Sequence, residues 1–390
     1  MTSWPTSMPD SVPPRSVERI TTTGAWGVGD DIGGRRFARV VGAEGLDLEA
    51  GGHLGPVEIA YETWGELDST AGNAVLVLHA LTGDSHARGP TGPGHPSPGW
   101  WPDIIGPGAP IDTERFFVVC PNVLGGCQGT TGPASIAPDG KRYGSRFPII
   151  TIRDQVHVEA LLADHLGISR WAGVVGGSMG GMRVLEWCVG SPERVERAVV
   201  VAVGAAATAE QIGLCSLQVR VIRADPAFAG GDYYDNDVGP AQGLALARGM
   251  GQVSYRTASE LDVRFGREAQ GVEQPLKGGR YRVESYLEHH GDTLLLRFDA
   301  NSYIVLSEAM NHHDVGRGRG GITAALSGVE ARVSVVGISS DRLYPIGLQY
   351  EMARLLPNAP EVRVVQSTVG HDGFLVETAA IGAWIADALA

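Results

Sequence analysis

The sequence predicts an α/β fold in which helices flank a mostly parallel sheet, with a helical segment inserted between two parts of that sheet. Two observations support this prediction. Over most of the chain, short apolar segments of strand length alternate with segments of helical periodicity, a pattern typical of parallel sheets buried on both faces. Between residues 206 and 316 the alternation stops, and helical patterns separated by polar loops replace it.

The first half of the chain supplies the first strands. Residues 36–41 and 57–63 are expected to form early strands that give the sheet an antiparallel start. Residues 73–81 (NAVLVLHAL) and 116–123 (FFVVCPNV) are nearly continuous in apolar residues, which predicts buried parallel strands. The segment 83–110 between them is dense in Gly and Pro and therefore predicts a loop.

The rest of the core continues the same alternation. Apolar residues at Val158, Leu161, Leu162 and Leu166 have the spacing of one helix face. The remaining elements expected in the core are helices at 152–166, 179–190, 348–356 and 374–389, and strands at 171–177, 197–203, 332–337 and 361–366.

The inserted segment contains helical candidates at 210–222, 242–250 and 302–310. Open α/β sheets place their sites at the strand ends, so we expect the insertion to form a helical lid over those ends. An independent second domain is the alternative. The expected division is a flexible N-terminal tail (1–25), an α/β core (26–205 and 317–390) and the lid (206–316).

Composition excludes several classes of protein. The net charge is 31 − 44 = −13, whereas binding to nucleic acid or an anionic membrane requires a basic face. No stretch approaches the about 18 consecutive apolar residues of a membrane-spanning helix, and the first twenty residues do not resemble a signal peptide. The cysteines form no CxxC pair, which favours buried thiols and a cytoplasmic enzyme.

The most specific motif is GGSMGG at residues 176–181, which follows a predicted strand and opens a predicted helix. It fits the G-x-S-x-G nucleophile elbow, a strained turn that exposes a serine at its apex. Small residues two positions before and after Ser178 permit the close approach of strand and helix. The motif and its context predict that Ser178 is a nucleophile.

A serine hydroxyl is a weak nucleophile until a base oriented by a carboxylate takes its proton. The α/β-hydrolase fold predicts the chain order Ser, Asp, His, with the acid after one late strand and the base after the next. Asp341 follows the predicted strand 332–337, and His371 follows the strand 361–366. The sequence therefore predicts a catalytic triad of Ser178, Asp341 and His371.

The triad requires an oxyanion hole formed by two backbone N–H groups. In this fold one belongs to the residue after the nucleophile, here Met179, and the other to the loop after an early strand. In HALTGD (79–84), Leu81 is the expected second donor, with an ordinary strand-end loop as the alternative. The pairs His289-His290 and His312-His313 lack a metal-ligand spacing, so no metal site is expected.

Four segments together resemble the homoserine O-acetyltransferases of methionine biosynthesis: HALTGD (79–84), NVLGGCQGTTGP (122–133), GGSMGGMRVLEW (176–187) and VGHDGFL (369–375). The resemblance implies transfer of an acetyl group from acetyl-CoA, a cosubstrate, to L-homoserine through an acetyl-serine intermediate, without a tightly bound cofactor. It also implies a homodimer formed largely through the lid. Substrate-binding residues of the family correspond to Arg248, in GLALARGMG, and to Asp372.

The predicted charges suit this acceptor. Homoserine carries a carboxylate and an ammonium group, and a guanidinium can bind a carboxylate through two hydrogen bonds. Homoserine or serine O-succinyltransferases share the signature, and an esterase or thioesterase shares the triad. These alternatives remain open from the sequence. A non-catalytic protein of the same fold would be expected to have a broken triad.

Overall fold

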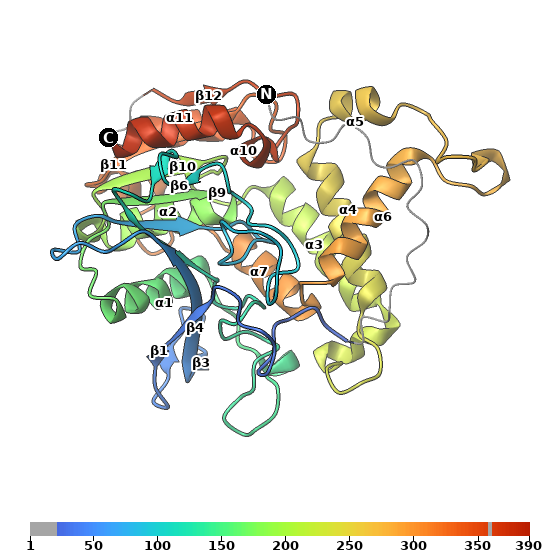
Figure 1. The fold of residues 1–390 in the computed structure, drawn as a ribbon, viewed down its shortest axis with the longest axis horizontal. Coiled ribbons are helices and arrows are strands. Elements are labelled where there is room, and N and C mark those ends of the chain that lie inside the picture. Colours follow the sequence, from blue (N-terminus) through green and yellow to red (C-terminus); the bar gives the residue numbers. More distant parts are fainter. Residues whose placement is uncertain (1–21, 358–360) are drawn as a thin grey trace.

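An eight-stranded sheet forms the centre of the computed structural model, which describes residues 22–357 and 361–390 (Figure 1). The strand order is β1-β4-β8-β5-β9-β10-β11-β12. The pairs β1–β4 and β4–β8 are antiparallel, and all other neighbours are parallel. Its strands are β1 (Arg36–Val41), β4 (Val57–Trp64), β5 (Ala74–Leu78), β8 (Phe117–Pro121), β9 (Gly173–Gly177), β10 (Arg197–Val201), β11 (Arg332–Ile338) and β12 (Arg363–Val365). Two small pairs, β2 (Leu46–Asp47) with β3 (His53–Leu54) and β6 (Ile105–Gly106) with β7 (Ile111–Asp112), lie outside it.

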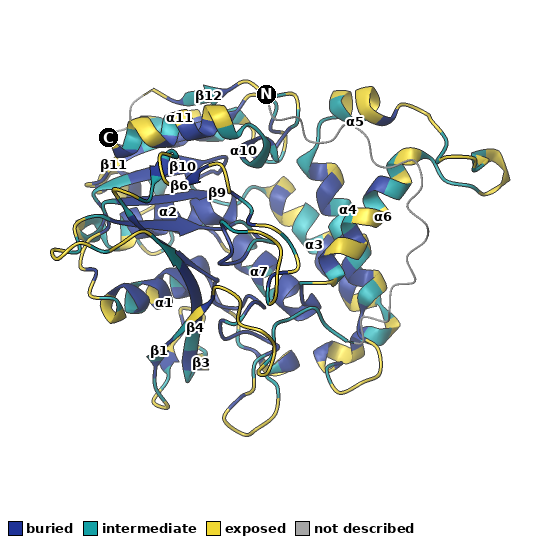
Figure 2. Cartoon of the chain, in the orientation of Figure 1, coloured by how far each residue is buried: buried dark blue, intermediate teal, exposed yellow. Residues whose placement is uncertain are grey.

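The central strands are apolar because both faces of the sheet are covered. Strands β5, β8 and β9 are buried at every position, as Figure 2 shows for the sheet. Successive side chains of a strand point to opposite faces. Leu76 and Leu78 accordingly belong to one hydrophobic cluster, and Val75 and Val77 to the other. This double burial explains the continuous apolar runs in the sequence.

Helices provide the two outer layers. On one face lie α1 (Ile152–His165), α2 (Met179–Gly190) and α9 (Ile346–Leu355), and on the other lies α11 (Thr378–Leu389). Figure 1 shows α1 and α11 on opposite sides of the sheet. The first turn of α1 is closed by a capping box between Thr151 and Asp154, an arrangement that satisfies otherwise unpaired backbone N–H groups.

Between β10 and β11 the chain forms helices and no strand. These are α3 (Ala209–Ala224), α4 (Ala241–Tyr255), α5 (Ala258–Phe265), α6 (Arg282–Leu295), α7 (Ala300–Asn311) and α8 (Ile322–Ser327). Figure 1 shows α3, α4, α5 and α6 to one side of the sheet, with α7 between them and the core. Helix α4 packs against both α3 and α6. The expected fold class, an α/β sheet with an inserted group of helices, is confirmed.

Several element bounds differ from the prediction. The strand expected at 73–81 ends at Leu78, because the following residues leave the sheet. The helix expected at 374–389 is divided into α10 (Gly373–Val376) and α11, with a non-helical Glu377 between them. The helices α5, α6 and α8 were not predicted individually.

Most of the expected N-terminal tail, residues 1–21, lies outside the described residues. The last residues of the expected tail, from residue 22 on, form hydrogen bonds with residues near the start of α7. Gly24 N–H donates to Phe298 O at 3.1 Å, and the Thr23 hydroxyl donates to Asp299 at 2.7 Å. None of the described helices is long and apolar enough to cross a membrane.

Candidate active site

Ser178 lies at the turn from β9 into α2, and its backbone is in an unusual conformation, with φ 56° and ψ −125°. Such a conformation in a non-glycine residue persists only where the surroundings enforce it. Two glycines make the turn possible. A β-carbon at Gly180 would lie 2.0 Å from Leu78 O, and one at Gly176 would lie 2.6 Å from the carbonyl carbon of Gly180. The motif therefore forms the strained elbow that the sequence predicts.

The structure brings the three predicted triad residues into one hydrogen-bonded chain. His371 Nε2 lies 2.9 Å from Ser178 Oγ, and His371 Nδ1 lies 2.7 Å from Asp341 Oδ2. Asp341 follows β11 and His371 follows β12, so both side chains lie at the carboxyl edge of the sheet with Ser178. All three residues are buried. This is the geometry in which a histidine can accept the serine proton.

The environment of His371 makes its imidazole more basic than an ordinary histidine. Burial alone would lower the pKa of His371, but the charge of Asp341, its hydrogen bond and the more distant Asp372 outweigh burial and raise that pKa above its ordinary value. The rings of Tyr344 and Tyr255 lie 5.1 and 5.8 Å from the imidazole centroid. The base therefore lies among aromatic rings and has the charge of Asp341 at close range.

Of the two predicted oxyanion donors, Met179 directly follows Ser178 in the chain, and the loop that carries Leu81 begins against α2, where a β-carbon at Gly180 would lie 3.1 Å from His79 O. Met179 is the first residue of α2, and Leu81 lies in the loop that follows β5. Among the described residues, neither Leu81 N–H nor Met179 N–H donates to a backbone or side-chain acceptor. Buried N–H groups are normally paired, so two donors without a protein acceptor suit a developing oxyanion.

Of the predicted substrate-binding residues, Arg248 lies on α4 (Ala241–Tyr255) and Asp372 directly follows His371. Arg248, on α4, places its guanidinium carbon 5.7 Å from the ring centroid of Tyr255, the residue that also contacts His371. In the described part of the chain, no carboxylate lies within ion-pairing distance of Arg248. Its charge is therefore available to an anion.

Asp372 already has protein partners, which the sequence analysis did not predict. Its Oδ2 lies 3.2 Å from Arg256 Nε and 3.2 Å from Gln252 Nε2, both at the C-terminal end of α4. Both contacts go to one oxygen, and no described residue donates to the other, Oδ1. Sequence reasoning missed Arg256 and Gln252 because nothing local indicates that α4 reaches the loop after β12.

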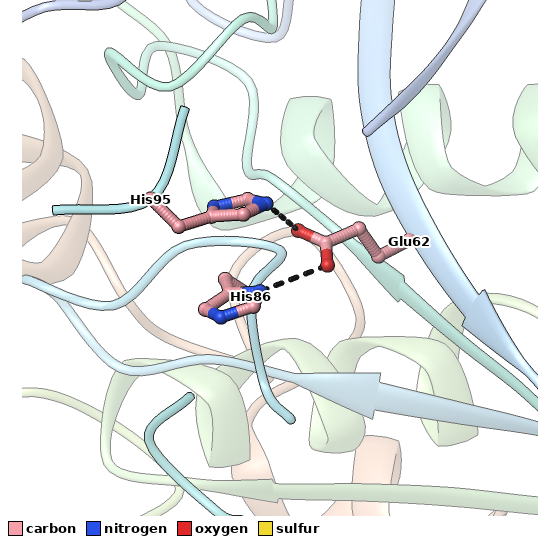
Figure 3. A group of neighbouring side chains, drawn as sticks. All are labelled: Glu62, His86 and His95. Carbon is pink, nitrogen blue, oxygen red and sulfur yellow. Dashed lines mark hydrogen bonds and ion pairs between the residues drawn. The ribbon is translucent and has the colours of Figure 1, made fainter. Parts of the chain in front are cut away.

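A buried cluster of Glu62, His86 and His95 is the candidate metal-binding group among the described residues (Figure 3). His86 Nδ1 lies 3.0 Å from Glu62 Oε2, and the two imidazole rings are stacked with centroids 3.7 Å apart. Gly34 N–H donates to His95 Nε2 at 3.0 Å, so that nitrogen's lone pair is in use. The two rings are nearly parallel, with an interplanar angle of 10°, so their in-plane lone pairs lie in separate parallel planes, which is a poor arrangement for two ligands of one ion. Hydrogen bonding accounts for this arrangement.

The adjacent histidine pairs have other environments. Burial lowers the pKa of His313 to about 4, and its Nε2 lies 3.0 Å from Gly204 O. Burial, with the nearby charge of Arg248, lowers the pKa of His290 to about 3. Neither pair belongs to a group of three potential ligands within the described residues.

The fold and the Ser–His–Asp geometry define the class of this protein, an α/β hydrolase, and the family model described as alpha/beta hydrolase fold matches residues 73–378. The relatives define it further. The chain is 56% identical over 382 residues to the homoserine O-acetyltransferase of Thermobifida fusca (strain YX), covering 98% of this chain and 99% of the relative. It is 57% identical over 344 residues to that of Mycobacterium tuberculosis (strain ATCC 25177 / H37Ra), covering 88% and 91%. The chain belongs to the homoserine O-acetyltransferase family.

Solved structures with the same architecture include both transferases and hydrolases. The homoserine O-acetyltransferase from Bacillus anthracis matches with a TM-score of 0.82 at 29% identity, covering 91% of this chain and 96% of that one. An acetylester hydrolase from Corynebacterium glutamicum matches with a TM-score of 0.79 at 27% identity, covering 92% and 96%. The architecture alone therefore does not separate the two reactions.

Proposed function

We propose that this protein is a homoserine O-acetyltransferase, which moves an acetyl group from acetyl-CoA to the hydroxyl of L-homoserine in the first committed step toward methionine. The observation that carries this proposal is the near full-length identity to enzymes of that name, 56% over 98% of the chain. The hydrogen-bonded Ser178, His371 and Asp341 support it with a mechanism.

In the first half-reaction, His371 Nε2 takes the proton of Ser178 Oγ as that oxygen attacks the thioester carbonyl. The carbonyl oxygen becomes an oxyanion that the N–H groups of Leu81 and Met179 stabilise. The tetrahedral intermediate collapses, the carbon–sulfur bond breaks, and the sulfur of CoA leaves with the proton from His371. Asp341 stabilises the imidazolium between these proton transfers.

In the second half-reaction, His371 takes the proton of the homoserine hydroxyl, and that oxygen attacks the acetyl-serine carbonyl. Collapse of the second tetrahedral intermediate returns the proton to Ser178 and releases the acetylated amino acid. CoA leaves before homoserine reacts with the acetyl-serine, so the kinetics are of the ping-pong type.

We infer that Arg248 and Asp372 hold the two charged groups of the acceptor. Arg248 supplies a guanidinium for the carboxylate, and no described carboxylate pairs with it. Asp372 supplies Oδ1 for the ammonium group while Oδ2 remains with Arg256. Both residues connect to the base, Arg248 through Tyr255 and Asp372 through the peptide bond to His371.

Product analysis tests the function. Purified enzyme is incubated with acetyl-CoA or succinyl-CoA and with L-homoserine, L-serine or no acceptor, and the products are identified by mass spectrometry. O-acetylhomoserine as the fastest-formed product is expected. Faster formation of a succinyl ester would favour the succinyltransferase alternative. Equal CoA release with and without acceptor would favour a thioesterase.

Acceptor recognition is tested separately with Arg248→Ala. Acetyl-CoA has neither acceptor charge at its reacting end, so acetylation of Ser178 should continue. Transfer to homoserine should fall by about 10–150-fold, the effect of losing about 1.5–3 kcal/mol of charge-assisted hydrogen bonding. Equal slowing of both half-reactions would show that Arg248 does not hold the carboxylate.

We also propose that the protein forms a homodimer largely through the inserted helices. The support is a set of apolar side chains on this part of the chain that are almost fully exposed: Val263 (90%), Val272 (98%) and Leu276 (100%). Exposed apolar side chains that gather in one patch mark interaction sites, and we propose that these three are covered by the second copy. Light scattering should give twice the mass of 41.1 kDa, and Val272→Asp with Leu276→Asp should shift it toward the monomer.

A further inference from the structure

Behind the nucleophile lies a fully buried charge network that the proposed chemistry does not use. Arg183 lies on α2 and is 0% exposed, and its Nη1 donates to Glu159 Oε1 of α1 at 2.6 Å. The other oxygen of Glu159 accepts from Trp187 Nε1 at 2.9 Å. Burying an ion pair costs desolvation energy and often adds no net stability. The pair of Arg183 and Glu159 is therefore expected to have a role other than stabilising the fold.

The second arm of Arg183 reaches the loop that carries the Leu81 N–H. Arg183 Nη2 donates to His79 O, the carbonyl of the first residue after β5. The backbone of α2 touches the same place, since a β-carbon at Gly180 would lie 3.1 Å from His79 O. The nucleophile helix therefore holds the end of β5 at two points.

His79 extends this constraint to the next peptide group. Val123 N–H can only donate, and it donates to His79 Nε2 at 3.0 Å, which leaves the proton of a neutral ring on Nδ1. That Nδ1–H donates to Ala80 O at 2.8 Å. Burial and the nearby Arg183 lower the pKa of His79 to about 3, in agreement with a neutral ring.

Fixing Ala80 O also fixes the direction of the Leu81 N–H. The two groups belong to one planar peptide and point in opposite directions. Gly83 N–H donates to Ala80 O as well, at 2.9 Å. Two successive peptide groups are thus held, the first by Arg183 and the second by the imidazole of His79 and the turn at Gly83.

We propose that Arg183 is a positioning residue of the oxyanion hole: through His79 O it sets the place of the Leu81 N–H relative to Ser178 and Met179. Arg183 touches no reacting atom and acts only through the loop. The inference rests on the proposed acyl transfer at Ser178. It assigns Glu159 the lesser task of holding and neutralising the guanidinium.

The test compares Glu159→Gln with the double variant Arg183→Met/Glu159→Gln. The single variant keeps the donor to His79 O, whereas the double variant removes it without leaving an unpaired buried charge. Rates are expressed per active site, titrated by acyl-enzyme formation, and melting temperatures are recorded for both variants. The rate constant for acetylation of Ser178 is measured with acetyl-CoA and, separately, with p-nitrophenyl acetate.

The double variant should acetylate Ser178 about 10–100-fold more slowly than Glu159→Gln, because complete loss of one oxyanion donor costs about 10²–10³-fold and here the donor is displaced. The KM for acetyl-CoA should stay within about threefold, since only transition-state binding changes. A purely structural role would lower the melting temperature of both variants and leave this rate per active site unchanged, which would overturn the proposal.

Arg183→Lys covers the case in which the double variant does not fold. It keeps a cation beside Glu159 but replaces the two-armed fork with a single ammonium group. A slower acetylation at unchanged KM is expected, and a wild-type rate would overturn the proposal. The ester substrate separates the positioning role of Arg183 from the proposed function. If wild-type enzyme reacts with p-nitrophenyl acetate but not with acetyl-CoA, the proposed function is wrong, and the role of Arg183 can still be measured with the ester.

Discussion

Replacing Asp341 by asparagine would test the triad through the tautomer of its histidine. Asp341 Oδ1 accepts from Leu343 N–H at 2.8 Å and from Tyr344 N–H at 2.9 Å, while Oδ2 accepts from His371 Nδ1 at 2.7 Å. The two backbone groups can only donate. In Asp341→Asn the amide oxygen must therefore stay with them, and the amide NH2 group faces the imidazole.

This orientation determines the chemistry. An amide donor opposite His371 Nδ1 requires an acceptor there, so the ring proton moves to Nε2. Nε2 can then no longer accept the proton of Ser178, from which it is separated by 2.9 Å. The expected loss in the rate of Ser178 acetylation is about 10⁴-fold, as for the equivalent change in serine proteases, or about 5.4 kcal/mol of transition-state stabilisation.

The assay follows CoA release with a thiol reagent and acetyl-serine formation by intact mass, under single-turnover conditions. Asp387→Asn is the matched control, because it makes the same chemical change at an exposed carboxylate on α11. It should retain the wild-type rate. A loss of less than about tenfold in Asp341→Asn, in a protein with an unchanged melting temperature, would refute the assigned roles, since tautomer control predicts a far larger loss.

The nucleophile, the base and the elbow glycine can each be tested by one substitution. Ser178→Ala should abolish acetyl transfer, a loss of about 10⁶-fold in a folded protein, measured as CoA release; comparable activity would exclude the serine as nucleophile. Only the neutral ring of His371 accepts a proton, so the raised pKa of His371 predicts that acetylation slows as the pH falls through a value above about 6.5. Asp372 contributes to that raised pKa, so Asp372→Asn should move the acidic limb of the pH–rate profile to lower pH. An unmoved limb would contradict the coupling between Asp372 and His371. Gly180→Ala should lower the melting temperature, because its β-carbon would lie 2.0 Å from a backbone oxygen, whereas Gly347→Ala, with nothing within 4 Å, should not; equal melting temperatures would contradict the close approach.

The triad was accessible to sequence reasoning because each of its residues has a local signal. The elbow around Ser178 is defined by glycines at fixed offsets, and Asp341 and His371 each follow a short apolar strand. Strands β9, β11 and β12 run parallel in one sheet, so their carboxyl ends lie at one edge. The hydrogen-bond distances then confirm that the three side chains meet.

The contacts that the sequence did not predict are those between elements far apart in the chain. The pairing of Asp372 with Arg256 joins α4 to the loop after β12, and that of Arg183 with Glu159 depends on how α2 packs against α1. Helix-to-helix register has no local signature. In contrast, the start of α5 did have one, since Thr257 caps the N–H of Glu260, the T-x-x-E spacing of a capping box.

Transfer and hydrolysis differ only in which hydroxyl attacks the acetyl-serine. An acetylester hydrolase superposes on this chain with a TM-score of 0.79 and covers 92% of it, so the architecture does not determine the outcome by itself. A transferase must hold its acceptor beside the base, and good positioning is worth effective molarities of about 10⁵–10⁸ M. In this structure Tyr255 contacts both Arg248 and His371, and Asp372 adjoins the base. We therefore expect selectivity for an amino-acid acceptor to depend on Arg248 of α4 and on Asp372. Substitutions at these residues should convert transferase activity into hydrolysis before they slow the acetylation of Ser178.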